Sequence, residues 1–468
     1  MGLATFLDRE HTVAPSDYSR WLVPPAALAI HLSIGQAYAF SVFNFPLSHL
    51  IGGKDQAASD WKLSTIGWVF SIAIVFLGLS AATFGRWVER VGPRKAMFAS
   101  ALCFSGGFLA SAIGVATHQF ALLLLGYGVL GGIGLGLGYI SPVSTLIKWF
   151  PDRPGMATGM AIMGFGGGAM IAAPLATALM KRFENSAAGG VAPTFVVMGL
   201  LYFAFMMFGV FTVRVPPDGW RPRADRELSS SEAKESTAPL RRAQSRQRVP
   251  RDVTADRAIK TPQFWLLWVM LCVNVTAGIG VLGQASPMIQ EMFPGVITAT
   301  AAAGFVGLLS LANMVGRFFW SSLSDYIGRK ATYATFFLLG AALYALVPST
   351  GHAGSVALFV IGYVVIMSMY GGGFATIPAY LRDMFGTIQV GAIHGRLLTA
   401  WSTAGVLGPV LVNYIREYQI NHGVAKADAY TITMYIMAGL LLIGFVCNLR
   451  VRPVHERHAV ESREMAPA

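Results

Sequence analysis

Apolar side chains run along this chain in long stretches rather than at alternate positions. Residues 120–140 read FALLLLGYGVLGGIGLGLGYI and carry no charge. A strand of a membrane barrel alternates polar and apolar residues over about ten positions, whereas about 20 apolar residues in a row suit a helix that crosses roughly 30 Å of hydrocarbon. We therefore predict an all-α integral membrane protein with twelve spans, at residues 21–46, 64–84, 95–116, 119–147, 155–180, 194–213, 263–287, 299–322, 331–349, 354–379, 391–414 and 429–450.

The predicted spans form two sets of six, separated by a polar segment. Residues 214–262 are rich in Arg, Ser, Pro and acids and contain few aliphatic side chains. Such a composition cannot bury enough apolar area to fold alone, so we predict a linker. The chain thus divides into an N-terminal segment, a six-helix bundle, the linker, a second six-helix bundle and a C-terminal tail, at residues 1–20, 21–213, 214–262, 263–450 and 451–468.

The composition agrees with a membrane protein. The 468 residues are 54% hydrophobic and 12% charged, against about 25% charged in ordinary globular proteins. The formal net charge of +12 comes mostly from loops on one side of the predicted helices, the linker and the termini. Because basic loops remain in the cytoplasm, we expect both termini to be cytoplasmic and the protein to lie in the inner (plasma) membrane. Contact of these loops with anionic lipid explains the charge without nucleic acid.

Motifs for metal, nucleotide or enzyme chemistry do not emerge from the sequence. The cysteines Cys103, Cys272 and Cys447 fall within predicted spans and lack disulfide or metal-ligand spacing. Glycine runs such as GYGVLGGIGLGLGY lack the strand and acidic partner of a nucleotide site and suit close packing of membrane helices. No nucleophile, base and orienting group can be grouped. We expect no cofactor, no metal and no enzyme activity.

One motif occurs in both halves of the chain. GRWVERVGPRK begins at Gly85 after the second span, and SSLSDYIGRK begins at Ser321 after the eighth. At one constant offset the acidic, glycine and basic positions of the two copies coincide, which indicates an internal duplication of a six-helix unit. We expect these loops to stabilise the outward-open state through contacts at the cytoplasmic face. The candidate residues are Gly85, Glu89, Gly92 and Arg94 in the first copy, and Asp325, Gly328, Arg329 and Lys330 in the second.

Twelve spans in two halves, with G-x-x-x-[D/E]-x-x-G-x-[R/K] between the second and third, resemble the major facilitator superfamily. Within it, GQAYAFSVFNFPL, GLGLGYISPVSTLIKWFPDRPGMATG, YGGGFATIPAYLRDMFG and GAIHGRLLTAWSTAGVLGP resemble the oxalate/formate antiporter family, which is akin to the monocarboxylate transporters of animals. The resemblance implies the major facilitator fold and transport of small carboxylates. It also implies that Tyr38, Tyr139 and Tyr370 correspond to cavity positions.

An arginine stands within the apolar stretch SLANMVGRFFW at residues 310–320, and the nearest acid along the chain is Asp325. An arginine inside a membrane span is costly and marks a functional site by default. Ser310, Asn313, Arg317 and Ser321 recur at intervals of three and four and form one polar stripe. The alternative is that Arg317 extends to the cytoplasmic surface and pairs with a headgroup or with Asp325.

We predict that Arg317 binds a carboxylate, because the planar guanidinium matches a carboxylate with two parallel hydrogen bonds. Asn313 lies one turn away and can orient the guanidinium without neutralising it. In the animal relatives, the resemblance implies an aspartate at the position of Asn313, so this chain lacks that counter-ion. The other substrate-binding candidates lie near the centres of their spans, where the alternative is ordinary packing: Gln36, Tyr38, Tyr139, Tyr370 and Trp401.

Three further residues are candidates for a proton or gate function. His31 lies in the first span, and His394 and Arg396 lie at the cytoplasmic start of the eleventh. Histidine can exchange protons near neutral pH, although a lone histidine in a span is more often a packing residue. No Asp or Glu falls within a predicted span. Protons, if they are transported, must therefore travel on the substrate, on His31 or through water.

The sequence thus predicts a secondary transporter of small carboxylates that works by alternating access. In the family's oxalate exchanger, the resemblance implies a second cation on the eleventh span, near the position where this chain has Trp401. A single cation favours monocarboxylates such as lactate, pyruvate or formate. The partners that remain open are a proton or a counter-transported carboxylate, with membrane lipid around the protein. The alternatives are an oxalate:formate exchanger and a carboxylate sensor that does not transport.

Overall fold

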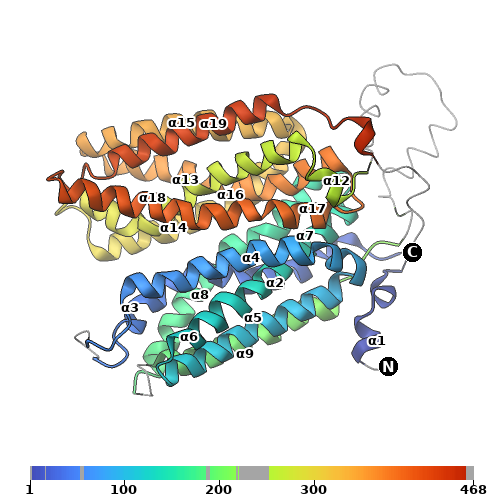
Figure 1. Cartoon of the computed structure of the whole chain (residues 1–468), viewed down its shortest axis with the longest axis horizontal. Helices are drawn as coiled ribbons and strands as arrows, with labels where there is room; N and C mark the ends of the chain where they lie inside the picture. The colour runs from blue at the N-terminus through green and yellow to red at the C-terminus, as the bar shows by residue number, and fades with distance from the viewer. Residues whose placement is uncertain are drawn as a thin grey trace.

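The computed structural model of the protein is built from helices (Figure 1). It describes residues 3–15, 17–52, 57–185, 190–217, 220 and 252–459. Within these residues, twelve helices are long and apolar enough to cross a membrane. The prediction of an all-α protein with twelve spans in two bundles is confirmed. Most of the predicted linker and the last residues of the tail lie outside the described residues.

The N-terminal bundle contains six spans, of which the first and fourth are composite. The first joins α2 (Pro24–Ile34), a 3-10 segment (Gly35–Phe43) and α3 (Asn44–Leu47), and the fourth joins α6 (Phe120–Leu123), a π-helical segment (Leu124–Gly131) and α7 (Gly132–Trp149). The others are α4 (Leu63–Val91), α5 (Pro93–Ala116), α8 (Pro154–Arg182) and α9 (Val191–Thr212). The short α1 (Leu3–Leu7) precedes them.

The C-terminal bundle is more regular. Its spans are α13 (Pro262–Met292), α14 (Ala299–Ile327), α15 (Arg329–His352), α16 (Val356–Phe385), the pair α17 (Val390–Leu397) and α18 (Thr399–Asn421), and α19 (Thr431–Arg450). The four-residue α12 (Ala255–Ala258) precedes α13. Its first and fourth spans, α13 and α16, are continuous α-helices, unlike their counterparts in the other bundle.

The two bundles lie one above the other in Figure 1, and both ends of the chain lie at the same end of the molecule. We call this the termini end, and the opposite end, where α3 lies, the far end. At the termini end lie α1, α12 and α17. An even number of spans requires both termini to be on one side of a membrane, as the arrangement shows.

Glycines allow the two bundles to approach where α8 crosses α14 and where α17 crosses α4. A Cβ added to Gly155 would overlap the carbonyl oxygen of Ser321, and one added to Gly395 would overlap that of Ala81. Small residues at such crossings let helix backbones come close in a membrane. The bundles therefore meet directly, backbone against backbone, along both crossings.

Candidate functional site

Arg317 of α14 lies between the two bundles, in contact with α8. Its side chain is fully buried. Its Nε donates to Asn313 Oδ1 at 2.8 Å, and its Nη1 donates to the carbonyl of Ile162 in α8 at 3.4 Å. Nη2 has no hydrogen-bond partner among the described residues. In this structure Arg317 neither reaches the surface nor pairs with Asp325.

Two phenylalanines flank the guanidinium. The Cζ atom of Arg317 is 5.6 Å from the ring centre of Phe165 in α8 and 5.3 Å from that of Phe374 in α16. A cation over an aromatic face is stabilised without being neutralised. Phe165 and Phe374 were not among the residues predicted from the sequence. They leave the arginine buried, oriented and without a carboxylate partner among the described residues.

The predicted aromatic residues gather beside Arg317. The hydroxyls of Tyr38 and Tyr370, from opposite bundles, are 3.1 Å apart. Trp401 lies with its ring centre 5.3 Å from that of Tyr139 and 6.3 Å from that of Tyr38. Arg317 also lies within hydrogen-bonding reach of the hydroxyls of Tyr38 and Tyr139. We call Arg317, Asn313, Tyr38, Tyr139, Tyr370, Trp401, Phe165 and Phe374 the central site.

Three buried donors of the central site are incompletely bonded. Arg317 Nη2, the Tyr139 hydroxyl and Trp401 Nε1 make no hydrogen bond of good geometry within the described part of the chain, although Arg317 and the Tyr139 hydroxyl lie within reach of each other. A buried polar group that lacks a partner costs about 1–3 kcal/mol. Because all three groups can donate, an acceptor with several lone pairs matches this arrangement better than another donor.

Gln36 lies apart from these residues. Its Oε1 accepts a hydrogen bond from the Tyr127 hydroxyl at 2.9 Å, and the Tyr127 ring packs against Phe40 and Phe108 in the N-terminal bundle. A 3-10 helix has three residues per turn, so Gln36 and Tyr38 point to different sides of the first span. The structure thus joins Gln36 to the interior of the N-terminal bundle rather than to Arg317.

Two buried histidines flank Tyr139 from opposite bundles. The ring centres of His31 and His394 are 5.4 Å and 5.8 Å from that of Tyr139. His31 Nδ1 is 3.2 Å from the carbonyl oxygen of Ala27. Neither ring nitrogen of His394 has a hydrogen-bond partner among the residues described. The two histidines therefore border the central site without contacting a carboxylate in the described structure.

Arg396 lies farther toward the termini end. Its Nη2 is 2.7 Å from Oδ1 of Asp256 in α12, and Asp256 also pairs with Arg86 at the end of α4. Arg86 and Arg396 belong to different bundles, so the acid at the end of the linker contacts both. This places Arg396 among the contacts that hold the termini end together, rather than in the central site.

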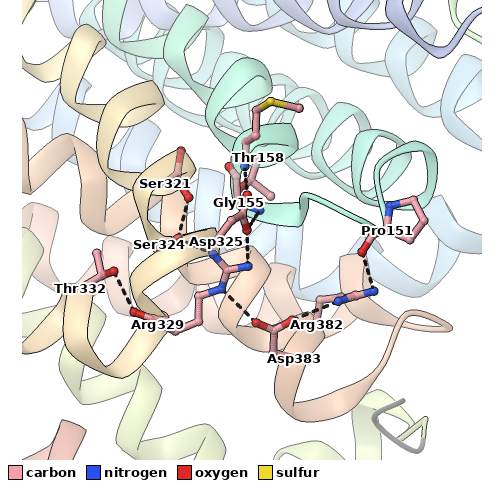
Figure 2. A network of polar contacts seen from close by, with 12 residues as sticks. Pro151, Gly155, Thr158, Ser321, Ser324, Asp325, Arg329, Thr332, Arg382 and Asp383 are labelled. Atoms are coloured by element: carbon pink, nitrogen blue, oxygen red, sulfur yellow. Dashed lines mark hydrogen bonds and ion pairs between the residues drawn. The ribbon is translucent and has the colours of Figure 1, made fainter. Parts of the chain in front are cut away.

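Asp325 connects the two bundles at the termini end (Figure 2). It lies near the end of α14 and accepts hydrogen bonds from the backbone N–H groups of Gly155 and Met156, both at 2.8 Å. Arg329 Nη2 is 2.7 Å from Asp325 Oδ1, and Arg329 Nε is 2.9 Å from Asp383 Oδ2. The first N–H groups of a helix lack partners and carry partial positive charge, so Asp325 suits the start of α8.

Glu89 makes the corresponding contact in the other half. It lies near the end of α4 and accepts from the backbone N–H of Gly391, at the start of α17, at 3.0 Å. Lys148 Nζ lies 2.7 Å from Glu89 Oε2. At the offset that matches Glu89 with Asp325, Gly391 matches Gly155. The duplicated motif therefore makes equivalent contacts across the two crossings of the bundles.

The other motif residues shape each half by itself. Gly92 and Gly328 both have φ of 87°, a conformation that favours glycine. Arg94 donates to the carbonyls of Phe6 and Val213, at the end of α9, and Lys330 donates to those of Leu449 and Val451, at the end of α19. In each half the basic residue thus contacts a carbonyl at the end of the sixth helix, although the shorter bond of Arg94 is to Phe6. A Cβ on Gly85 would lie close to Ala392 of α17.

Comparison with known families agrees with this architecture. The sequence profile described as Major Facilitator Superfamily matches residues 16–409 and 285–468. The chain belongs to the major facilitator superfamily. It is therefore a multi-pass membrane transporter rather than an enzyme.

Several relatives within the superfamily have names that refer to carboxylates. The chain is 25% identical to the oxalate:formate antiporter of Oxalobacter formigenes over 451 residues, which cover 96% of each chain. It is 25% identical to apicoplast pyruvate carrier 1 of Toxoplasma gondii over 73% of this chain and 68% of that protein. It is 23% identical to human monocarboxylate transporter 11, over 91% of this chain and 81% of the other.

A solved superfamily structure shows the same fold. The transporter FucP, in the outward conformation, aligns with a TM-score of 0.63 and 13% identity over 92% of this chain and 100% of its own. At this identity the likeness concerns the fold alone. It agrees with the two six-helix bundles of the present structure.

The internal duplication of the chain provides a sequence signal for Phe165. At the offset that matches Glu89 with Asp325, Phe165 of α8 matches Trp401 of α18, and the two rings are 5.3 Å apart. Phe374 lies within the YGGGFATIPAY motif, next to the predicted Tyr370. Repeat symmetry and motif membership together would have indicated both phenylalanines.

Proposed function

We propose that this protein transports small monocarboxylates, such as lactate, pyruvate or formate, by alternating access. The observation that carries the proposal is the central site: a buried arginine, oriented by Asn313, with an unpartnered nitrogen beside other unpartnered donors. A carboxylate supplies four lone-pair positions and one negative charge. The carboxylate-transporting names among the relatives support the same substrate class.

In this proposal Arg317 supplies charge and direction. Asn313 holds Nε, which leaves the far edge of the guanidinium to bind the carboxylate. Hydrogen bonds to a charged partner contribute about 1.5–3 kcal/mol each. The hydroxyls of Tyr38 and Tyr139 bind the same anion, and the rings of Trp401 and Phe374 contact a small apolar tail.

The number of cations favours one carboxylate. In the described part of the chain, Arg317 is the cation in contact with the central aromatic residues. A dianion would leave its second carboxylate unpaired and desolvated, at a cost of several kcal/mol. Exchange of oxalate for formate is the second candidate, because the oxalate:formate antiporter matches over nearly the whole chain. That candidate requires a second cation, and His394, with its ring centre 5.8 Å from that of Tyr139, is a candidate for it.

We propose further that the termini end is cytoplasmic in the inner membrane, as the positions of the basic loops indicate. With the termini end closed by Asp325 and Glu89, the described conformation is then closed to the cytoplasm. Opening this end requires the two bundles to separate at the α8–α14 and α4–α17 crossings. His31 and His394, on opposite bundles, are the proposed groups for any proton exchange that accompanies this movement.

The test is counterflow in proteoliposomes that contain the purified full chain. Vesicles loaded with unlabelled lactate should accumulate external labelled lactate transiently, and pyruvate and formate should replace lactate in the interior. A pH gradient, applied in a second arm, distinguishes proton symport from exchange. A protein that binds lactate but shows no counterflow would be a sensor, and absence of both binding and counterflow for every carboxylate would reject the proposed substrate class.

A further inference from the structure

A groove opens on the surface between α8 and α14, outside the central site. It has a volume of about 440 Å³. Met163 of α8 forms one side, and Met314, Val315, Phe318 and Phe319 of α14 form most of the other. Ser322, Leu323 and Tyr326 complete the lining toward the end of α14.

The groove faces the bilayer rather than the protein interior. Both of its helices are membrane spans, and Val315 and Phe319 are each 53% exposed. Its lining extends along α14 from Met314 to Tyr326, or about 18 Å at 1.5 Å per residue. That is close to the depth of one leaflet, since the whole hydrocarbon core is roughly 30 Å thick. The groove therefore lies in the leaflet at the termini end.

The volume of the groove limits the size of the molecule that can occupy it. A transmembrane helix of about 10 Å diameter would need on the order of 1,400 Å³ over the same length, which is far more than the groove offers. The groove is apolar and narrow, which suits a single lipid acyl chain.

An exposed arginine precedes the start of α8, near the residue that follows the Asp325 contact. Tyr326 is 76% exposed at the end of the lining. Its neighbour Asp325 accepts from the N–H of Gly155 (Figure 2), and the exposed Arg153 lies two residues before Gly155. Asp325 is already paired with Arg329, whereas no carboxylate in the described part of the chain pairs with Arg153. A positive side chain at this depth matches the headgroup of an anionic lipid.

We propose that this groove is a binding site for a phospholipid, with one acyl chain between α8 and α14 and the phosphate at Arg153. The two helices belong to different bundles, so the lipid bridges them beside the Asp325 contact. A ligand that binds one conformation more tightly shifts the population toward it. Because separation of the bundles would divide the groove, the bound lipid stabilises the conformation with the termini end closed.

The experiment uses phosphatidylglycerol with a photoreactive diazirine in the middle of one acyl chain, added to the purified full chain in detergent. Irradiation and peptide mapping should place adducts on 314–326 and near Met163, with saturation at low lipid fraction and competition by unlabelled phosphatidylglycerol. Val315→Trp fills the groove and should reduce these adducts at least fivefold. The matched control Leu308→Trp, at another exposed position of α14, should leave them unchanged.

A second set of variants keeps the test decisive. Ser322→Phe fills the groove from another position and replaces Val315→Trp if that variant does not fold. Arg153→Gln should weaken labelling by phosphatidylglycerol at least threefold while the mapped position stays the same. Equal labelling of Val315→Trp and Leu308→Trp would overturn the proposal. The proposal would also be overturned if the wild-type protein were a dimer that dissociates in Val315→Trp while lipid labelling stays unchanged. A second copy of the chain would then occupy the groove.

Discussion

At the termini end, Asp325 of the C-terminal bundle binds the start of α8, and Glu89 of the N-terminal bundle binds the start of α17. At the centre, the same offset matches Arg317 with Ala81 and His394 with Thr158. The repeat is thus preserved in the layer that joins the bundles. In the central site it keeps the aromatic pair Phe165 and Trp401 but not the arginine. In the proposed mechanism both halves contribute to opening and closing, whereas the charge for binding comes from one half.

This difference relates the symmetry of the fold to the chemistry of the substrate. In the proposed mechanism, equivalent acid contacts on both crossings break together when the bundles part as rigid units. A symmetric centre would carry two cations or none, and a single arginine provides for one carboxylate. The predictions below separate the two regions, beginning with the central arginine.

Arg317→Lys should produce the largest loss. Lysine keeps the charge but replaces the planar fork with a point charge, so carboxylate affinity should fall on the order of 100-fold, with two charged hydrogen bonds of about 1.5–3 kcal/mol at stake. Counterflow of labelled lactate at several concentrations measures this loss. Insertion into the membrane should remain normal.

A matched control exists in another buried arginine. Arg94 is also nearly unexposed, but it bonds backbone carbonyls, as Lys330 does at the equivalent position. Arg94→Lys should therefore retain transport. Near wild-type affinity in Arg317→Lys would contradict the assignment of Arg317 to the substrate.

Trp401→Lys should introduce the second cation that the centre lacks. The Trp401 ring is 4.5 Å from that of Phe374, which flanks Arg317, so an ammonium there can reach the other carboxylate of a dianion. The ratio of oxalate to lactate affinity should rise at least tenfold, or about 1.4 kcal/mol. Competition against labelled lactate measures the ratio, and Trp401→Met serves as the uncharged control. An unchanged ratio would show that Trp401 does not face the substrate.

Asp325→Asn should loosen the termini end without altering the central site. The neutral amide loses the attraction to Arg329 and to the N-terminus of α8, and its contacts with two N–H groups weaken. In a background without Cys103, Cys272 and Cys447, labelling of Ser144→Cys by an impermeant thiol reagent from the cytoplasmic side should become severalfold faster. Glu89→Gln should have a smaller effect, because Glu89 accepts from one backbone N–H. Unchanged labelling in Asp325→Asn would show that the Asp325 contact does not keep the termini end closed.

Deletion of residues 224–248 should have the smallest effect. These residues lie outside the part that the structure describes, and their composition does not support a packed core. Uptake by folded protein should stay within about twofold of wild type. The deletion leaves Asp256 in place, with its contacts to Arg86 and Arg396. Loss of uptake despite normal insertion would reveal a function of the linker in transport.

The hydrophobic pattern was sufficient to predict the fold, because the length of each apolar stretch is dictated by the membrane. It did not predict the 3-10 segment at Gly35–Phe43 or the π segment at Leu124–Gly131, because hydropathy is equal in all helix types. Those segments decide where side chains point. Gln36 and Tyr38 are both polar and central in the sequence, yet the 3-10 geometry directs Gln36 to Tyr127.

Residues of the candidate site could be predicted where their residue type is rare in membrane helices, and not where it is common. A buried arginine and its asparagine one turn away are conspicuous in an apolar helix, and the structure joins them by a hydrogen bond. Phe165 and Phe374 are two among 30 phenylalanines, so only their places in the repeat and in a motif distinguish them. The tertiary packing of α8 and α17 decides which loops meet across the bundles. Without the duplication, the sequence would not indicate this pairing.

The most direct test of a single-cation centre is to let monocarboxylates and dicarboxylates compete for binding to the wild-type protein. Proteoliposomes or purified protein should be titrated with formate, lactate, pyruvate, oxalate and malonate against labelled lactate at constant pH. One arginine without a carboxylate partner in the described structure predicts that monocarboxylates compete at least tenfold better than oxalate, a difference of about 1.4 kcal/mol. Saturable and preferred binding of oxalate would contradict the account and would direct the search for a second cation to His394 or Arg396.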